Sequence, residues 1–129
     1  MKSGIILYVH GARDPRWAEP FRRLRARVEA RGEGAPVALA FLEHGSPDLA
    51  EAAAAMANDG VASIRIVPMF FGRGGHLRDD FPRHLEAARA RVPEVTFEVT
   101  EAAGESEQVL EALATFALGA DRDVDSDIK

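Results

Sequence analysis

The stretch IRIVPMFFGRGGH, residues 64–76, decides the fold of this chain. Its first part, residues 64–71, is almost entirely apolar, which is typical of a strand that is covered on both faces of a sheet. Its second part is a glycine-rich loop that ends at His76, and such a loop lets the backbone approach a ligand closely and exposes its amides. The stretch therefore predicts a strand of a parallel sheet with a functional loop at its carboxyl end.

Two earlier apolar runs end in a similar way. Residues 5–9 lead directly into His10, and residues 37–42 lead directly into Glu43. In an open parallel α/β sheet the carboxyl ends of the strands lie at one edge, where such folds bind their ligands. We therefore expect His10, Glu43 and His76 to converge there as a site that binds a metal or transfers protons.

Helical patterns separate the strands. Apolar side chains recur at helical spacing over residues 16–31, and an Ala-rich helix extends to residue 58. A third helix follows the glycine-rich loop through about residue 91, and a fourth strand is expected at residues 95–99. Connections this short force right-handed crossovers. We predict an open, mainly parallel four-stranded sheet flanked by helices, as in a flavodoxin-like fold.

Two predictions concern individual helices. Ser46 should cap the second helix, with Pro47 at its first position. A last helix, over residues 105–118, is amphipathic and should turn its apolar side chains inward. These side chains are Val109, Leu110, Leu113 and Phe116.

Length and composition limit the class of protein. We expect one domain over residues 1–119 and an acidic, disordered tail over residues 120–129. The chain has no cysteine, so any metal must be bound by imidazole and carboxylate, and this composition suits a reducing cytoplasm. The first apolar run is too short for a signal peptide or a membrane span. The net charge of -5 argues against nucleic acid as the main partner.

Each candidate residue also has an ordinary structural interpretation. His10 could cap the first strand, Glu43 could be a solvated loop acid, and His76 could be incidental to its loop. His84 lies on the third helix, where it is expected to be solvated or to pack against a neighbouring helix. His44 is either a spare ligand or has no role. The convergence of the first three residues at one edge favours a functional site.

Basic side chains flank the proposed site. Arg13, Arg73 and Arg78 could pair with the carboxylates of a substrate through bidentate hydrogen bonds. The backbone amides of Gly74 and Gly75 could add further donors. Solvated surface positions are the alternative for the three arginines.

Three motifs follow one another along the chain in a recognisable order. They are HGARDP at residues 10–15, FLE at residues 41–43 with Pro47, and PMFFGRGGH at residues 68–76 with DFP at residues 80–82. Together they resemble the CbiX type of sirohydrochlorin chelatase, a class II tetrapyrrole chelatase. The resemblance implies insertion of Co²⁺ or Fe²⁺ into sirohydrochlorin, on the routes to cobalamin or siroheme. By this resemblance His10 and His76 match the metal-binding histidines, and Glu43 matches their acidic partner.

The resemblance extends from about residue 5 to residue 99, with two departures. Ala12 stands where the family usually has Ser, which puts a minor hydrogen bond in doubt. His44 follows Glu43 where an apolar residue is commoner, and this could add a ligand or alter the choice of metal. The chain resembles the short, single-half form, which is expected to act as a homodimer with the tetrapyrrole between its subunits. No organic cofactor is implied.

The chemistry can also be argued from the residues. Histidines suit cobalt, ferrous iron and Ni²⁺ as intermediate ligands, and they exchange a metal for a proton near neutral pH. Glu43 would be a further ligand or a general base. The macrocycle needs an apolar slot. Candidates for this slot are Met69, Phe70, Phe71 and Leu77, with core packing as the main role expected for Phe70.

Other functional classes remain as alternatives. A phosphohistidine-type phosphatase would usually have an arginine immediately before His10, where this chain has Val9. An α/β-hydrolase would need a Gly-x-Ser-x-Gly elbow, which the sequence lacks. A carrier that binds metal or tetrapyrrole without turnover would keep the same ligands, so it is the stronger alternative.

Overall fold

One parallel sheet organises the part of the chain that the structure describes. The computed structural model describes residues 2–72 and 75–119, and the side chains of residues 75–78 lie outside this description. The strands are β1 (Lys2–Val9), β2 (Val37–Phe41), β3 (Val61–Pro68) and β4 (Thr96–Val99). They form a four-stranded sheet in the order β2-β1-β3-β4, and all three pairings are parallel. The predicted open parallel sheet is confirmed.

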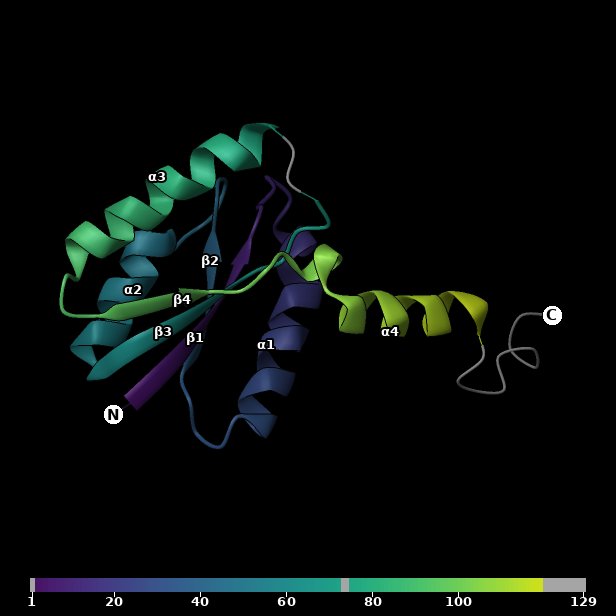
Figure 1. Ribbon diagram of the computed structural model, residues 1–129, viewed down its shortest axis with the longest axis horizontal. Coiled ribbons are helices and arrows are strands. Elements are labelled where there is room, and N and C mark those ends of the chain that lie inside the picture. The colour runs from purple at the N-terminus through teal and green to yellow at the C-terminus, as the bar shows by residue number, and fades with distance from the viewer. Residues whose placement is uncertain (1, 73–74, 120–129) are drawn as a thin grey trace.

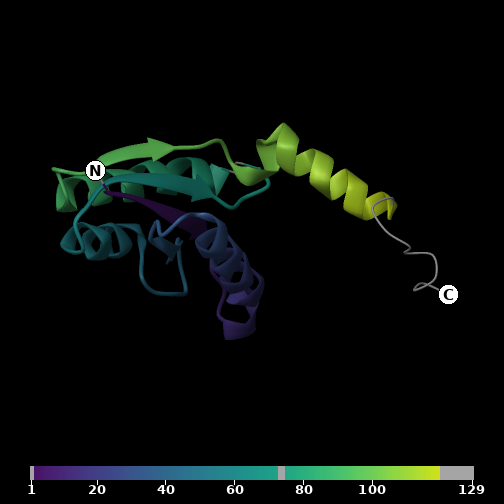
Figure 2. The ribbon, with the colours of Figure 1, turned by 90° about the horizontal axis from the view of Figure 1, so that it is seen from below.

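Helices lie on both sides of the sheet (Figure 1). The short 3₁₀ helix η1 (Pro15–Ala18) leads into α1 (Glu19–Arg31), which packs on one face. The other face is covered by α2 (Leu49–Asn58) and α3 (Gly75–Arg91). After β4 come the 3₁₀ helix η2 (Ala103–Glu105) and α4 (Glu107–Leu118). Figures 1 and 2 both show α4 extending away from the sheet.

The alternation of side chains along β1 builds a core on each face. Leu7 and Val9 pack with the apolar side of α1, whereas Ile6 and Tyr8 pack in the cluster that includes α2 and α3. All four side chains are buried. Because burying one large apolar side chain contributes about 1.5–3 kcal/mol, β1 is held firmly from both sides. The packing of β1 therefore fixes the position of His10, the residue that follows it.

The start of α2 differs from the sequence prediction. The side chain of Asp48 accepts a hydrogen bond from the Glu51 amide at 2.8 Å, and the Glu51 carboxylate accepts one from the Asp48 amide at 2.9 Å. This reciprocal capping box places Ser46 and Pro47 outside the helix, joined by a cis peptide bond. The prediction that Ser46 caps α2 and Pro47 begins it is wrong, because Asp48 offers a charged acceptor directly to the first turn.

The boundaries of β3 also differ from the predicted range of residues 64–71. The strand begins and ends earlier, and Pro68 is its last residue. The amide of Met69 still donates to the carbonyl of Tyr8 at 2.8 Å, but the chain then leaves the sheet. Phe70 turns into the core, whereas the side chain of Phe71 is 71% exposed. An apolar run therefore predicted the strand but not its end.

The predicted inward orientation of the last helix is wrong. All of α4 lies in the described part of the chain, and none of its residues is buried. Leu110 and Leu113 are 38% and 39% exposed, and Phe116 is 72% exposed. The physical reason is the direction of the helix, because α4 mainly contacts the adjoining η2 and extends past the end of the sheet.

The prediction of a disordered tail at residues 120–129 concerns positions outside the described residues. Across residues 2–72 and 75–119, no helix combines the length and the apolar character that crossing a membrane requires.

Candidate functional site

The candidate site lies at the carboxyl edge of β1 and β2. His10 directly follows β1, and Glu43 comes shortly after the end of β2. Backbone hydrogen bonds continue the pairing beyond both strands: the Leu42 amide donates to Val9 at 2.9 Å, and the Glu43 amide donates to His10 at 3.0 Å. These bonds hold the two loops together, so the structure brings together two of the three side chains on which the site prediction depends.

The side chains of His10 and Glu43 face each other across this pairing. The distance between His10 Nε2 and Glu43 Oε2 is 3.8 Å, and the side chains are 40% and 43% exposed. The ring of Phe70 packs edge-on against the His10 ring, with 5.8 Å between centroids. The pair is therefore supported by the core on one side and open to solvent on the other.

The close approach of the two loops requires a glycine at position 11. Gly11 has a φ of +101°, and a Cβ built there would lie 1.7 Å from the carbonyl oxygen of Glu43. Side chains are disfavoured at such a φ, and here one would also overlap backbone. The His10-Gly11 sequence thus has a steric reason, because only glycine lets the loop after β1 pass against the loop that carries Glu43.

The loop between β1 and η1 contains the remaining residues of the first motif. Asp14 caps η1 by accepting a hydrogen bond from the Arg16 amide at 2.9 Å. The Arg16 guanidinium, 2.7 Å from the Asp14 carboxylate, lowers the pKa of that carboxyl group. Arg13 is exposed in this loop. His44, next to Glu43, is also exposed and has a left-handed backbone with a φ of 54°.

The glycine-rich loop is only partly described. Gly75 begins α3 and His76 lies in its first turn, at the same end of the sheet as the ends of β1 and β2 (Figure 1). The predictions for Arg73 and Gly74, and those for the side chains of His76, Leu77 and Arg78, fall outside the described residues. Among the side chains that are described, no three His, Asp or Glu residues gather closely enough to hold a metal ion.

Sequence reasoning missed a polar contact beside the site. Tyr8 in β1 and His10 just after it both pack against Phe70, and the Tyr8 hydroxyl is 2.6 Å from His84 Nδ1 on α3. The Tyr8 ring also packs edge-on against Phe70, with 5.8 Å between centroids. Side chains alternate between the two faces of a strand, so the two-residue spacing of Tyr8 and His10 could have predicted that they lie next to each other. His84 was expected to be solvated or to pack against a neighbouring helix, whereas the structure shows a partly buried side chain that bonds to a strand.

Burial raises the pKa of Tyr8 above its ordinary value, and the negative charges of Asp80 and Asp48 add to this effect. The phenol therefore stays protonated in the folded protein across the neutral range. Its hydrogen bond to His84 ties α3 to β1 directly behind the candidate site.

The spacing of His10 and Glu43 suits a shared divalent cation. Metal–ligand distances for imidazole nitrogen and carboxylate oxygen are about 2.0–2.2 Å, so two donors on one ion lie at most about 4.3 Å apart. The distance of 3.8 Å between Nε2 and Oε2 falls within that limit. Such donors accept cobalt, iron and nickel, and both can also take up a proton.

A family model and relatives of known name match most of this chain or a large part of it. The family model described as CbiX matches residues 4–117. A relative from Sulfurisphaera tokodaii named sirohydrochlorin cobaltochelatase is 29% identical over 117 residues, covering 85% of this chain and 87% of the relative. A relative of the same name from Methanopyrus kandleri is 32% identical over 81 residues, covering 63% of this chain and 57% of the relative.

Solved structures share the fold. A crystal structure of a CbiX protein from Marinobacter aquaeolei VT8 matches with a TM-score of 0.77 and 30% identity, covering 92% of this chain and 96% of that chain. SirB from Bacillus subtilis with Fe³⁺ matches with a TM-score of 0.76 and 23% identity. That match covers 95% of this chain but 48% of SirB, so the chain spans about half the length of SirB.

Proposed function

The chain belongs to the CbiX family, and on this basis we propose that it inserts Co²⁺ or Fe²⁺ into sirohydrochlorin, the activity of a lyase. The family match over residues 4–117 and the relatives named sirohydrochlorin cobaltochelatase support this proposal. The observation that carries it is the approach of His10 and Glu43 to 3.8 Å at the carboxyl edge of the sheet. Cobalamin and siroheme synthesis are the routes that such an activity would serve.

We propose His10, Glu43 and His76 as the catalytic and metal-binding residues. Insertion exchanges one divalent cation for the two protons of the pyrrole nitrogens, so the site must release a metal and accept protons. Half-exposed His10 and Glu43 would hold the entering ion loosely, and each can take up a proton once the ion has left. His76, in the first turn of α3, would supply the third donor.

The tetrapyrrole would meet an apolar surface and a ring of hydrogen-bond donors. Phe70 is buried against His10 and Met69 packs with the α1 cluster, so the exposed Phe71 is the described apolar side chain left to contact the macrocycle. The carboxylates of sirohydrochlorin would be bound by arginines and glycine amides around the site. These are Arg13, Arg73, Gly74, Gly75 and Arg78.

We further propose that the chain acts as a cytoplasmic homodimer that encloses the tetrapyrrole between its subunits. The chain matches about half of SirB, and in this proposal a second copy stands where SirB has its other half. The proposal includes no nucleic acid, membrane or organic cofactor. The net charge of -5 disfavours binding to the phosphates of nucleic acid. Ni²⁺ is a further candidate substrate because imidazole and carboxylate also bind it.

Anaerobic mixing of the purified chain with sirohydrochlorin and Co²⁺ or Fe²⁺ tests the proposed activity. We expect the absorption spectrum of the macrocycle to change faster than in the spontaneous reaction, with several turnovers per protein. His76→Ala should abolish the gain, whereas Arg22→Ala, an exposed substitution on α1, should keep it. Tight binding without acceleration would indicate a carrier, and hydrolysis of a phosphoester would indicate a phosphatase; either result contradicts the proposal.

A further inference from the structure

One side-chain hydrogen bond joins β1 to α3 behind the candidate site. The Tyr8 hydroxyl lies 2.6 Å from His84 Nδ1, where Tyr8 is fully buried and His84 is half-buried. A phenol can donate or accept a hydrogen bond, so the contact is satisfied in either tautomer of the histidine. Because a buried polar group without a partner costs free energy, each of these side chains fixes the position of the other.

Tyr8 contacts α3 on both sides of a proline. Pro82 lies inside this helix, where proline has no amide hydrogen to donate and its ring collides with the carbonyl one turn earlier. The Tyr8 ring packs against Phe81 with 5.3 Å between centroids, and the Tyr8 hydroxyl bonds to His84. Tyr8 therefore connects the two parts of the helix that Pro82 weakens at their junction.

The same tyrosine reaches the candidate site through Phe70. The Phe70 ring packs edge-on against both Tyr8 and His10, with 5.8 Å between centroids in each contact. The Phe70 carbonyl accepts a hydrogen bond from the Gly104 amide at 2.8 Å, which holds the backbone and leaves the ring contacts to orient the side chain. Close-packed interiors transmit displacements, so a shift of Tyr8 would reach the His10 ring.

The length of α3 amplifies any movement at this contact. The helix begins at the edge of the sheet where β1 and β2 end (Figure 1), and His76 precedes His84 by eight residues. The backbone of His76 therefore lies about 12 Å along the helix axis from the Tyr8 contact. A tilt of about 5° around that contact would move this backbone by about 1 Å, which is enough to misplace a group that must meet a ligand.

We propose that Tyr8 and His84 are positioning residues for the metal site. Their hydrogen bond holds α3 against β1 and so sets the place of His76 relative to His10. Tyr8 acts on the His10 ring through Phe70, and His84 acts on His76 through the helix to which both belong. Neither Tyr8 nor His84 is a ligand itself. The inference rests on the proposed function, because it takes His10 and His76 as ligands of one ion.

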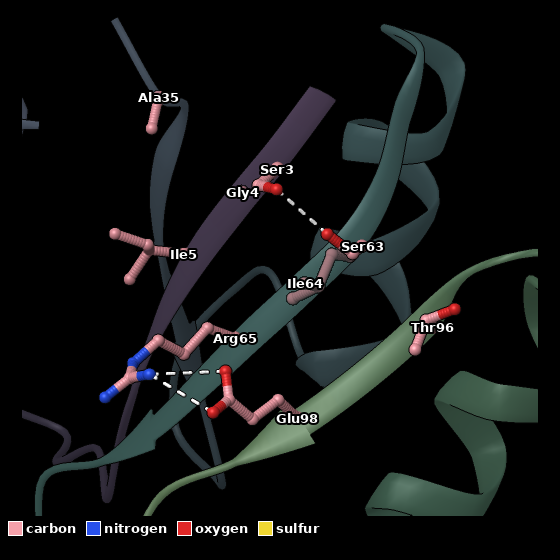
Figure 3. Close-up of a pocket in the computed structure, with 9 residues that line it drawn as sticks. All are labelled: Ser3, Gly4, Ile5, Ala35, Ser63, Ile64, Arg65, Thr96 and Glu98. Carbon is pink, nitrogen blue, oxygen red and sulfur yellow. Dashed lines mark hydrogen bonds and ion pairs between the residues drawn. The ribbon is translucent and has the colours of Figure 1, made fainter. Parts of the chain in front are cut away.

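Nuclear magnetic resonance of the metal-free protein tests the connection to His10. Tyr8→Phe removes the hydroxyl and keeps the ring. We expect the imidazole signals of His10, identified by their loss in His10→Ala, to shift because the Phe70 ring packs against that imidazole. Ser3→Ala is the matched control and should leave these signals in place. It removes a hydroxyl at the other end of β1, where Ser3 and Ser63 bond at 2.9 Å (Figure 3).

Titration with Co²⁺ alone tests the consequence for metal binding. Tyr8→Phe and His84→Leu should each raise the dissociation constant about fivefold, the factor that one net hydrogen bond supplies. The double variant should bind no more weakly than either single variant, because both changes remove the same bond. His84→Asn should recover most of the wild-type affinity, because its amide places a hydrogen-bonding atom near the position of Nδ1. Ser3→Ala should bind Co²⁺ like the wild type.

Steady-state insertion separates positioning from a general loss of stability. A destabilised protein has a smaller folded fraction, which lowers kcat and leaves the KM for Co²⁺ unchanged. A misplaced ligand instead weakens the binding of the ion. We therefore expect Tyr8→Phe to raise the KM for Co²⁺ about fivefold and to leave the KM for sirohydrochlorin at its wild-type value.

Four results would overturn the inference. They are unchanged His10 signals in Tyr8→Phe, a wild-type Co²⁺ affinity in that variant, and an affinity of His84→Asn no better than that of His84→Leu. The fourth is a lower kcat in Tyr8→Phe with an unchanged KM for Co²⁺, which would assign the bond to stability alone. The first two assays contain no tetrapyrrole, so a wild type that binds Co²⁺ without inserting it would contradict the proposed function and not this inference.

Discussion

Replacing Gly11 by alanine should remove the approach of His10 to Glu43 and weaken the fold at the same time. Two effects add at this position. The left-handed backbone, with a φ of +101°, costs about 1–2 kcal/mol for a residue with a Cβ. The Cβ would also lie 1.7 Å from the carbonyl oxygen of Glu43, so one of the two loops must move.

Moving the loops breaks the hydrogen bond from the Glu43 amide to His10, which contributes about 1 kcal/mol. We therefore expect Gly11→Ala to lower the free energy of unfolding by about 2–4 kcal/mol in urea titrations. Metal insertion should fall by about a hundredfold, because a displacement near 1 Å has that effect on positioned groups.

Gly34→Ala is the matched control. Gly34 also has a left-handed backbone, with a φ of +89°, but a Cβ there would meet nothing within 4 Å. It should lose about 1–2 kcal/mol from backbone strain alone and keep the wild-type rate. Equal destabilisation of both variants, or a wild-type insertion rate in Gly11→Ala, would refute the steric argument for the site.

Three further substitutions test the local structure. The unfolded chain ionises its single tyrosine near pH 10, whereas burial raises the pKa of Tyr8 in the folded protein. The free energy of unfolding should therefore fall above about pH 10, by at most about 1.4 kcal/mol per pH unit, and Tyr8→Phe should remove that part of the slope in urea titrations. Asp48→Ala removes the cap of α2, so it should lower the free energy of unfolding by about 1 kcal/mol in thermal or urea unfolding. Ser46→Ala should lower it by less than about 0.5 kcal/mol. A larger loss for Ser46→Ala than for Asp48→Ala would show that Ser46 is the cap.

The sheet and its functional edge could be predicted from the sequence because their determinants are local. A strand covered on both faces requires an apolar run, and parallel strands joined by helices bring their carboxyl ends to one edge. These two facts predict that His10 and Glu43 converge at the same edge of the sheet. The steric role of Gly11 could not be predicted, because it depends on where the loop of a neighbouring strand passes.

The direction of α4 is the clearest case of information that the sequence does not hold. Periodicity shows that Leu113 and Phe116 share one side of a helix, but the pattern is the same whether the cover is the sheet of the same chain or another surface. The start of α2 is a different case, because the sequence did contain its signal. The pattern Asp48-x-x-Glu51 is typical of a capping box, and in the structure this pair caps the helix in place of Ser46. The role of His76 and a domain limit at residue 119 stay predictions.

A double-mutant cycle on the initial rate of Co²⁺ insertion tests most directly whether His10 and Glu43 act on the same metal ion. His10→Ala, Glu43→Gln and the double variant are compared with the wild type at fixed sirohydrochlorin. Residues that share one ion act as a unit, so the double variant should lose no more rate than the more damaging single variant. Losses that multiply, or a wild-type rate in either single variant, would contradict the account.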